Sequence, residues 1–212
     1  MSQIPGVGNA TFWSLVEHFG SPENVLNRTT EELKKAGQIG KRQLQGFSQI
    51  KETKKSCLQQ LRKLENIGGK FLTFADDHYP ELLKQISDPP PVLYLRGDKG
   101  VLSTCCVAIV GSRASTTYGN RTAFGLAKNL GHAGVTIVSG LALGIDAESH
   151  RGALAAGGAT IAVLGCGIDV VYPRQHTDLY KEIAEKGVVV SEYPLGTSPE
   201  GFRFPARNRI IS

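Results

Sequence analysis

Four short apolar runs rich in β-branched residues constrain this chain more than any other feature. They alternate with segments of helical character, and each run is closed by glycine or serine. Alternating strands and helices indicate a parallel sheet, and near-continuous apolar strands indicate burial on both faces. We therefore predict an α/β fold with a Rossmann-like, doubly wound, mostly parallel sheet covered on both faces, whose ligands bind beyond the carboxyl ends of the strands. The expected strands are 105–110, 135–139, 159–164 and 188–191, and the expected helices are 118–132, 145–156 and 175–186.

Residues 1–70 are predicted to form a separate, all-helical unit. Apolar side chains recur at helical spacing, and the segment 49–66 is typical of a long, solvated helix. The stretch 4-IPGVG-8 before a helix resembles the hairpin of a helix-hairpin-helix or SAM-like element, whose glycine amides can contact phosphates or serve only for packing. A looser copy follows at 36–44, where Gly37 is expected to close the preceding helix.

Residues 71–100 are predicted to connect the helical unit to the α/β repeat. FLTFA is expected to be a strand, 79–86 a short helix, and VLYL a second strand after three consecutive prolines. We predict two domains, 1–70 and 71–212.

Composition favours a soluble protein whose basic region either binds a polyanionic partner or serves only for solvation. The chain has 212 residues and a net charge of +5, and residues 1–70 alone, with 11 basic and 6 acidic side chains, carry a net +5. The apolar runs exclude disorder as the main state, and the sequence contains no membrane-length apolar stretch. The first residues carry neither a basic segment nor an apolar one, so we expect no secretory signal. We expect a cytoplasmic location and no membrane partner.

The four cysteines are predicted to be buried, reduced thiols. They form no C-x-x-C pair, and three of them lie in or beside expected strands, which disfavours a disulfide or a metal site. They are Cys57, Cys105, Cys106 and Cys166.

The turn after the first expected strand, 111-GSRASTTYG-119, has the composition of an anion-binding loop. Gly111 permits a sharp turn, hydroxyl side chains follow, and the next helix offers free N–H groups and the positive end of its dipole. Arg113 can bind a phosphate through two hydrogen bonds. An ordinary strand–helix turn with a solvated arginine explains the loop equally well.

Two later turns carry weaker signals. Gly140 and Gly144 permit tight turning beside a helix, Asp146 is expected to cap that helix, and His150 is expected to be a core contact rather than a metal ligand. The third turn, GCGID, holds only part of a dinucleotide fingerprint, and no P-loop motif occurs. We predict no cofactor, no metal and no catalytic set.

The run 202-FRFPARNRIIS-212 combines arginines with phenylalanines. Guanidinium groups pair with phosphates and an exposed phenyl ring stacks on a base, a combination suited to single-stranded nucleic acid. The alternative is that Phe202 and Phe204 belong to the core while Arg203, Arg207 and Arg209 are merely solvated.

The motif series as a whole resembles the DNA-processing protein A (DprA/Smf) family. The motifs are VAIVGSR, VSGLALGIDAESH, TIAVLGCGIDVVYP, VSEYPLG and FPARNRIIS, in that order over residues 71–212, and the helical front resembles that family's helix-hairpin-helix or SAM-like domain. The resemblance implies a DNA-binding protein that protects single-stranded DNA during natural transformation and helps to load RecA while displacing single-strand-binding protein. It implies no enzymatic activity.

The resemblance also assigns candidate DNA-binding residues in a basic pocket. It implies that the glycine, serine and arginine of VAIVGSR hold phosphate, that the second phenylalanine of the C-terminal run stacks on a base, and that the R-N-R triplet lines the pocket. Gly140 in the adjoining turn and Arg203, chosen for charge and proximity, complete the set. Leu143 stands where some members carry a basic residue. The predicted nucleic-acid-binding residues are Gly111, Ser112, Arg113, Gly140, Arg203, Phe204, Arg207, Asn208 and Arg209.

The family's Rossmann domain continues well past the RNRIIS motif, so the resemblance implies that residues 71–212 form an incomplete domain. The sheet would then lack its last strands, which puts the family's homodimer in doubt for this chain.

Two other functions compete. LOG-type nucleoside-monophosphate phosphoribohydrolases have a similar phosphate-binding fold, but their P-G-G-x-G-T-x-x-E motif is absent up to Ser212. The second competing function is that of a protein-interaction scaffold, in which the glycine-rich loops have only a structural role and bind no anion.

Overall fold

The computed structural model describes residues 1–36 and 39–212, and a six-stranded sheet dominates its second part. The strand order is β1-β2-β6-β5-β4-β3, with β3 to β6 parallel and β2 antiparallel to both β1 and β6. The mostly parallel α/β class predicted from the sequence is confirmed. The strands are β1 (Gly69–Thr73), β2 (Val92–Gly97), β3 (Cys106–Ala108), β4 (Thr136–Ser139), β5 (Thr160–Val163) and β6 (Val188–Ser191).

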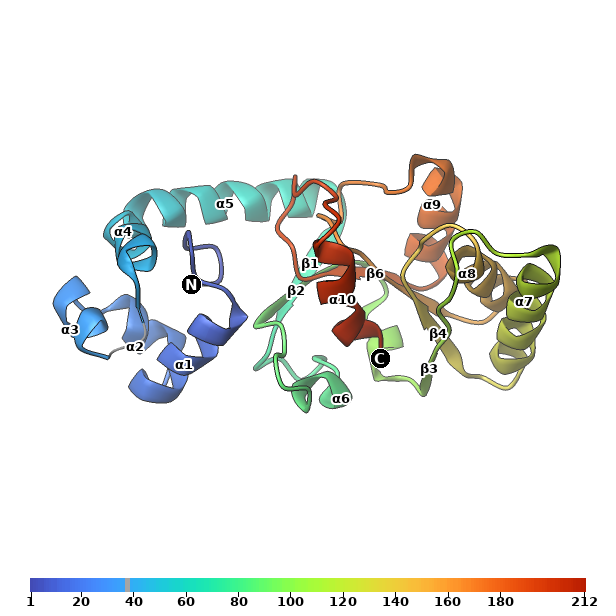
Figure 1. Cartoon of the computed structure of the whole chain (residues 1–212), viewed down its shortest axis with the longest axis horizontal. Coiled ribbons are helices and arrows are strands. Elements are labelled where there is room, and N and C mark those ends of the chain that lie inside the picture. The colour runs from blue at the N-terminus through green and yellow to red at the C-terminus, as the bar shows by residue number, and fades with distance from the viewer. Residues whose placement is uncertain (37–38) are drawn as a thin grey trace.

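The three long helices of the repeat lie on one face of the sheet (Figure 1). Strands β3 to β6 follow one another in order across the sheet, so each right-handed crossover places its helix on the same side. Among the described residues both faces of the sheet are covered, as predicted, but unequally, because the long helices all lie on this one face. These helices are α7 (Thr117–His132), α8 (Ile145–Ala155) and α9 (Thr177–Lys186), the last preceded by the 3-10 turn η2 (Arg174–His176).

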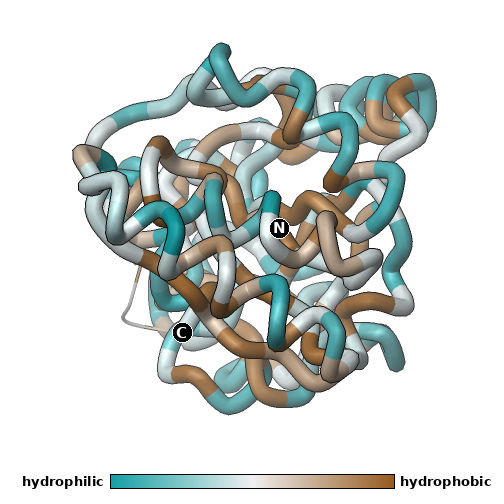
Figure 2. Tube along the Cα trace, turned by 90° about the vertical axis from the view of Figure 1, so that its right-hand side faces the viewer, coloured by the Kyte–Doolittle hydropathy of each residue, from teal (hydrophilic) through white to brown (hydrophobic). Residues whose placement is uncertain are grey.

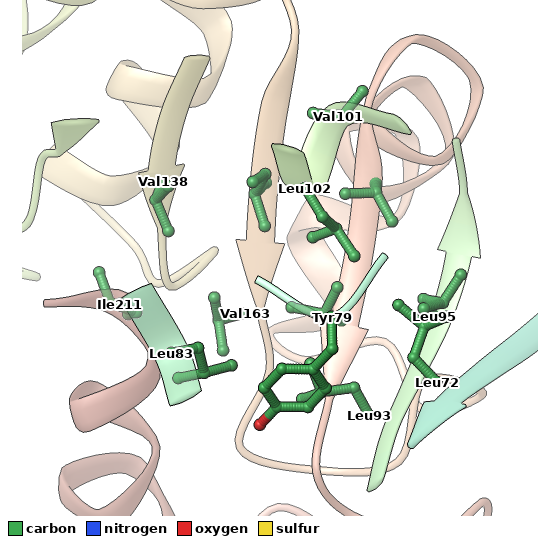
Figure 3. Packing of buried hydrophobic residues seen from close by; sticks show 13 residues of the cluster. Leu72, Tyr79, Leu83, Leu93, Leu95, Val101, Leu102, Val138, Val163 and Ile211 are labelled. Carbon is green, nitrogen blue, oxygen red and sulfur yellow. The ribbon is translucent and has the colours of Figure 1, made fainter. Parts of the chain in front are cut away.

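The opposite face carries only short elements. They are α6 (Glu81–Lys84), the 3-10 turn η1 (Lys99–Ser103) and α10 (Arg203–Ile211). Figure 3 shows side chains of these elements, including Leu83, Leu102 and Ile211, around strand residues such as Val138 and Val163. A cavity of about 410 Å³ lies between these elements and the sheet. The second face of the sheet is therefore incompletely packed by the described residues.

Alternation along the strands divides the core between the two faces. Ile137 packs with Ala127 and Ala153 under α7 and α8, whereas its neighbour Val138 belongs to the cluster on the opposite face. In Figure 2, brown and teal residues alternate around the helical turns, as expected for helices with one buried side. None of the described helices is both long and apolar enough to span a bilayer.

Strand β3 is the edge of the described sheet, and this corrects the prediction for two cysteines. Its three residues are exposed, and so is Cys105 directly before it. Cys57 is half-buried, whereas Cys166 is buried as predicted. Cys105 and Cys106 are exposed because strand β3 has a neighbour on one side only.

The helical front has its own small core, and α5 links it to the sheet (Figure 1). Ile4 and Val7 of the 4–8 hairpin are buried in that core, while the hairpin glycines are exposed. Residues 37 and 38 of the looser hairpin copy, including the expected helix stop at Gly37, lie outside the described residues. The helices are α1 (Asn9–Phe19), α2 (Pro22–Leu26), α3 (Thr30–Lys35), α4 (Lys41–Ser48) and α5 (Ile50–Asn66).

Polar contacts hold the helical front against the second part. The Trp13 indole N–H donates to the Pro89 carbonyl at 2.7 Å, and the Gln3 amide donates to the Tyr94 hydroxyl at 2.7 Å. The Trp13 ring also meets the Phe74 ring edge-on at 4.6 Å.

Small residues set the contact between α7 and α8. A Cβ atom on Gly152 would lie 2.9 Å from the Ala127 Cβ and closer still to the Phe124 carbonyl oxygen, whereas a Cβ on Gly125 would meet nothing within 4 Å. The two glycines are both in helix interiors, so they form a matched pair.

We expect Gly152→Ala to destabilise the fold by about 1–3 kcal/mol through overpacking. Gly125→Ala should stabilise it by about 0.5–1 kcal/mol, because alanine loses less backbone entropy in a helix. Urea unfolding of both variants measures the difference. Equal midpoints would contradict the close approach of α7 and α8.

Candidate nucleic-acid interface

A buried carboxylate joins two of the predicted turns at the carboxyl ends of β3 and β4. Asp146 is 5% exposed, and its Oδ1 and Oδ2 accept hydrogen bonds from the backbone N–H groups of Gly111, at 3.2 Å, and Gly140, at 3.1 Å. Asp146 is thus not the cap of α8, because its carboxylate bonds to the two turns. The Gly111 N–H therefore has a hydrogen-bond partner within the protein.

Arg207 ties α10 to the same place. It is 3% exposed and donates from Nη1 to the Gly140 carbonyl at 3.0 Å and to the Val163 carbonyl. Burial lowers the pKa of its guanidinium, and the negative charge of Asp146 opposes that shift. A Cβ on Gly140 would lie 2.7 Å from Asp146 Oδ2 and nearer still to Arg207 Nη2, so only glycine fits between the two charges.

The exposed part of the site is a short stack of three side chains. The Arg113 Cζ lies 5.2 Å from the centre of the Phe204 ring, and the Tyr172 ring lies on Phe204 at 5.5 Å with a 30° tilt. Phe204 rests on Gly165, where a Cβ would come within 2.9 Å of its Cδ1. Three turns and the first residues of α10 therefore converge, as the sequence predicted for Arg113 and the C-terminal run.

Arg113 has its charge available to solvent. Among the described residues, no carboxylate oxygen lies within 4.0 Å of its guanidinium, and the side chain is exposed. Ser112 and Asn208 are exposed nearby in sequence, with the Ser112 hydroxyl accepting from the Ala114 N–H at 3.2 Å and Asn208 Oδ1 accepting from Arg207 Nε at 3.2 Å.

Arg203 and Arg209 are engaged within the protein. Arg203 pairs with Glu200 at 3.1 Å and lies over the rings of Tyr193 and Phe202. Arg209 donates to both oxygens of Glu192, at 2.7 and 2.6 Å. These hydrogen bonds are the main cause that raises the pKa of Arg209.

Gly111, Arg203 and Arg209 use their donors within the protein, and the other six of the nine predicted residues fall into two groups by exposure. Ser112, Arg113, Phe204 and Asn208 present side chains to solvent or to the exposed stack, whereas Gly140 and Arg207 are buried. Five residues separate Phe204 from Arg209, about 140° around α10, so Arg209 points to the other side of the helix. The DNA contact of each residue stays a prediction.

Tyr172 is the aromatic side chain that the sequence analysis missed. It follows β5 in the segment DVVYP, and 42% of its surface is exposed beside Phe204. A tyrosine before a proline, in the turn that follows a buried strand, was the available signal, because turns at strand carboxyl ends lie on the ligand side.

His150 lies in the core beneath these turns, as predicted. The Thr160 hydroxyl donates its proton to the Ile137 carbonyl. The hydroxyl oxygen therefore accepts from His150 Nδ1, at 2.7 Å. The His150 Nε2 is buried without a hydrogen-bond partner among the described residues. Burial is the main reason that its pKa falls to about 3.

With the geometry established, comparison with known proteins identifies the family. Residues 70–212 match the sequence profile of DNA recombination-mediator protein A. This chain belongs to that family.

Relatives and solved structures agree with the DprA assignment. The Smf protein of Synechocystis is 39% identical over the whole of this chain and 54% of its own length, and DprA of Streptococcus pneumoniae is 44% identical over 68% of this chain and 51% of its own. The chain spans about half the length of these curated relatives.

Two solved structures of DprA proteins share the fold of this chain. The structure of the Streptococcus pneumoniae protein matches with a TM-score of 0.80 and 32% identity, over 97% of this chain and 70% of that one. DprA of Helicobacter pylori, described for its single-stranded DNA binding mode, matches with a TM-score of 0.61 and 36% identity, over 67% and 64% of the two chains.

We expect Arg207→Ala to lower the free energy of unfolding by about 3–5 kcal/mol, because it removes a buried side chain that binds the Gly140 and Val163 carbonyls and takes away the positive charge near the buried Asp146. Arg113→Ala removes the same charge from an exposed site and should change stability by less than about 0.5 kcal/mol. Urea unfolding compares the two variants. Similar small losses in both would contradict the buried role of Arg207.

The depressed pKa of His150 predicts acid sensitivity. The unfolded chain takes up a proton near the ordinary pKa of 6.5, whereas the folded chain does so only near 3. The contribution to stability is therefore complete above about pH 6.5 and falls by up to about 1.4 kcal/mol per pH unit as the pH drops towards 3. His150→Leu should flatten this part of the curve in urea titrations at successive pH values. A parallel curve would contradict the assignment.

Proposed function

We propose that this chain binds single-stranded DNA at the stack formed by Arg113, Phe204 and Tyr172. The unpaired guanidinium of Arg113, held over an aromatic ring at the carboxyl ends of the strands, is the observation that carries the proposal. A cation supplies a phosphate contact, and the neighbouring rings supply stacking surface that accepts any base. The single-stranded DNA binding described for the Helicobacter pylori relative supports the same chemistry.

The buried residues then act by positioning. Asp146 and Arg207 fix the two turns and the start of α10, so that Arg113 and Phe204 meet. Gly111 and Gly140 allow this close packing, while Ser112 and Asn208 add polar groups at its edge. In this proposal Arg203 and Arg209 shape the surface through their ion pairs with Glu200 and Glu192.

We propose binding rather than catalysis. The side chains that face solvent in the stack are a guanidinium, a phenyl ring and a phenol, and none of these side-chain types exchanges a proton near neutral pH in its ordinary state. The titratable Asp146 and His150 are buried behind them.

We further propose the mediator role that the family description names. Such a chain would hold single-stranded DNA in the cytoplasm, displace single-strand-binding protein and help to load RecA. The measurement is the growth of RecA filaments on DNA coated with single-strand-binding protein. The support is the family match over residues 70–212. The homodimer implied by the resemblance stays a prediction.

Two variants separate the phosphate contact from the stacking contact. Arg113→Ala should weaken binding of a labelled oligothymidylate and reduce the slope of log affinity against log salt by about 0.7, measured by anisotropy between about 50 and 200 mM salt. Phe204→Leu should cost about 1–3 kcal/mol of affinity and leave that slope unchanged, because stacking releases no counterion.

Arg151→Ala is the matched control for these variants. Arg151 is an exposed arginine of α8 that pairs with Glu148 at 2.6 Å, so its loss removes the same charge away from the stack. Its binding curve should follow that of the unmodified chain. Unchanged affinity in both Arg113→Ala and Phe204→Leu would refute the proposed site.

A further inference from the structure

The outer side of α5 carries an uncompensated basic stripe. Lys51, Lys55 and Arg62 lie within about 40° of one another around the helix, opposite the inner side that holds Leu64. All three are exposed, and so are the flanking Lys54 and Lys63. The stripe, defined here as Lys51, Lys55 and Arg62, therefore presents three positive charges on one side of α5, with the exposed Leu58 between Lys55 and Arg62.

Internal ion pairs do not account for this stripe. Among the described residues, no carboxylate lies within 4.0 Å of its cationic groups. Some cations on other helices are paired, as in Lys186 with Glu182 at 2.9 Å. Lys51 and Lys55 are four residues apart, a like-charge spacing that costs a helix about 0.2–0.5 kcal/mol. The arrangement weakens the helix, so stability alone gives no reason for it.

The carboxyl end of α5 reaches the edge where DNA binding is proposed. Leu64 packs with Ile168 and Leu195, and the Gln60 amide donates to the Leu195 carbonyl at 3.4 Å. Ile168 belongs to the turn that leads to Tyr172, and Leu195 belongs to the segment that leads into α10. From there α5 runs for about 25 Å along one side of the molecule (Figure 1).

We propose that this stripe is a second contact surface for single-stranded DNA. It binds the phosphate backbone of the strand that leaves the Arg113–Phe204 stack, and the inference therefore rests on the proposed function. Two lysines and an arginine with no aromatic side chain between them provide charge without base stacking. The contact is thus electrostatic, independent of sequence and dependent on DNA length.

The test compares a short and a long DNA strand. A triple variant, Lys51→Gln, Lys55→Gln and Arg62→Gln, removes three charges and keeps similar helix propensity. The ligands are oligothymidylates of about 6 and about 24 nucleotides, chosen to occupy the stack alone or to extend beyond it. The control triple, Arg151→Gln, Lys181→Gln and Lys186→Gln, removes three charges from α8 and α9. Circular dichroism checks the fold of each variant.

The α5 triple should bind the short strand normally and the long strand roughly tenfold or more weakly, with a loss of about 2 in the salt slope. The control triple should bind both normally. Equal weakening by both triples, or an unchanged long-strand affinity in the α5 triple, would overturn the inference.

Arg113→Ala separates this failure from failure of the proposed function. If Arg113→Ala weakens both strands while the α5 triple changes neither, the second surface is wrong and the stack stands. If the unmodified chain binds neither strand, both are wrong. Loss of affinity for vesicles with anionic headgroups in the α5 triple, without a change for DNA, would instead assign the stripe to a membrane surface and overturn the inference.

Discussion

The candidate site depends on one buried arrangement of charge, in which the Asp146 carboxylate accepts from two turns and Arg207 binds the carbonyl of one of them. Gly111 and Gly140 belong to different strand ends, and Arg207 belongs to α10. A buried charge is costly unless it is paired and hydrogen-bonded, so each partner requires the others. The three segments are thereby fixed in one geometry.

This arrangement separates the groups that build the site from those that face outwards. The Arg207 guanidinium donates hydrogen bonds to backbone carbonyls, and the Arg209 guanidinium donates to the Glu192 carboxylate. Arg113 retains its charge for solvent and lies over Phe204. Three arginines of similar appearance in the sequence thus have three different physical situations, and the stripe on α5 adds a fourth, in which the charge has neither a partner nor an aromatic neighbour.

The sequence anticipated the elements better than their arrangement. Strands β4 to β6 and helices α7 and α8 begin and end within a residue or two of the predicted ranges, because apolar periodicity and glycine stops are local signals. The same pattern misplaced Cys105 and Cys106, since an apolar run does not show whether its strand is central or at an edge. The unequal cover of the two faces of the sheet follows from strand order, which local periodicity does not contain.

The site divides in the same way. The sequence by itself determined which chemistry is present, because glycine turns after apolar strands and an arginine–phenylalanine run are visible as residue types and spacings. Only the tertiary structure decided which arginine is exposed, that Asp146 joins two turns instead of capping α8, and that Tyr172 stands beside Phe204. The physical reason is that burial and hydrogen bonding depend on residues far apart in the chain, and those neighbours exist only once the strands have paired and α10 has packed across their ends.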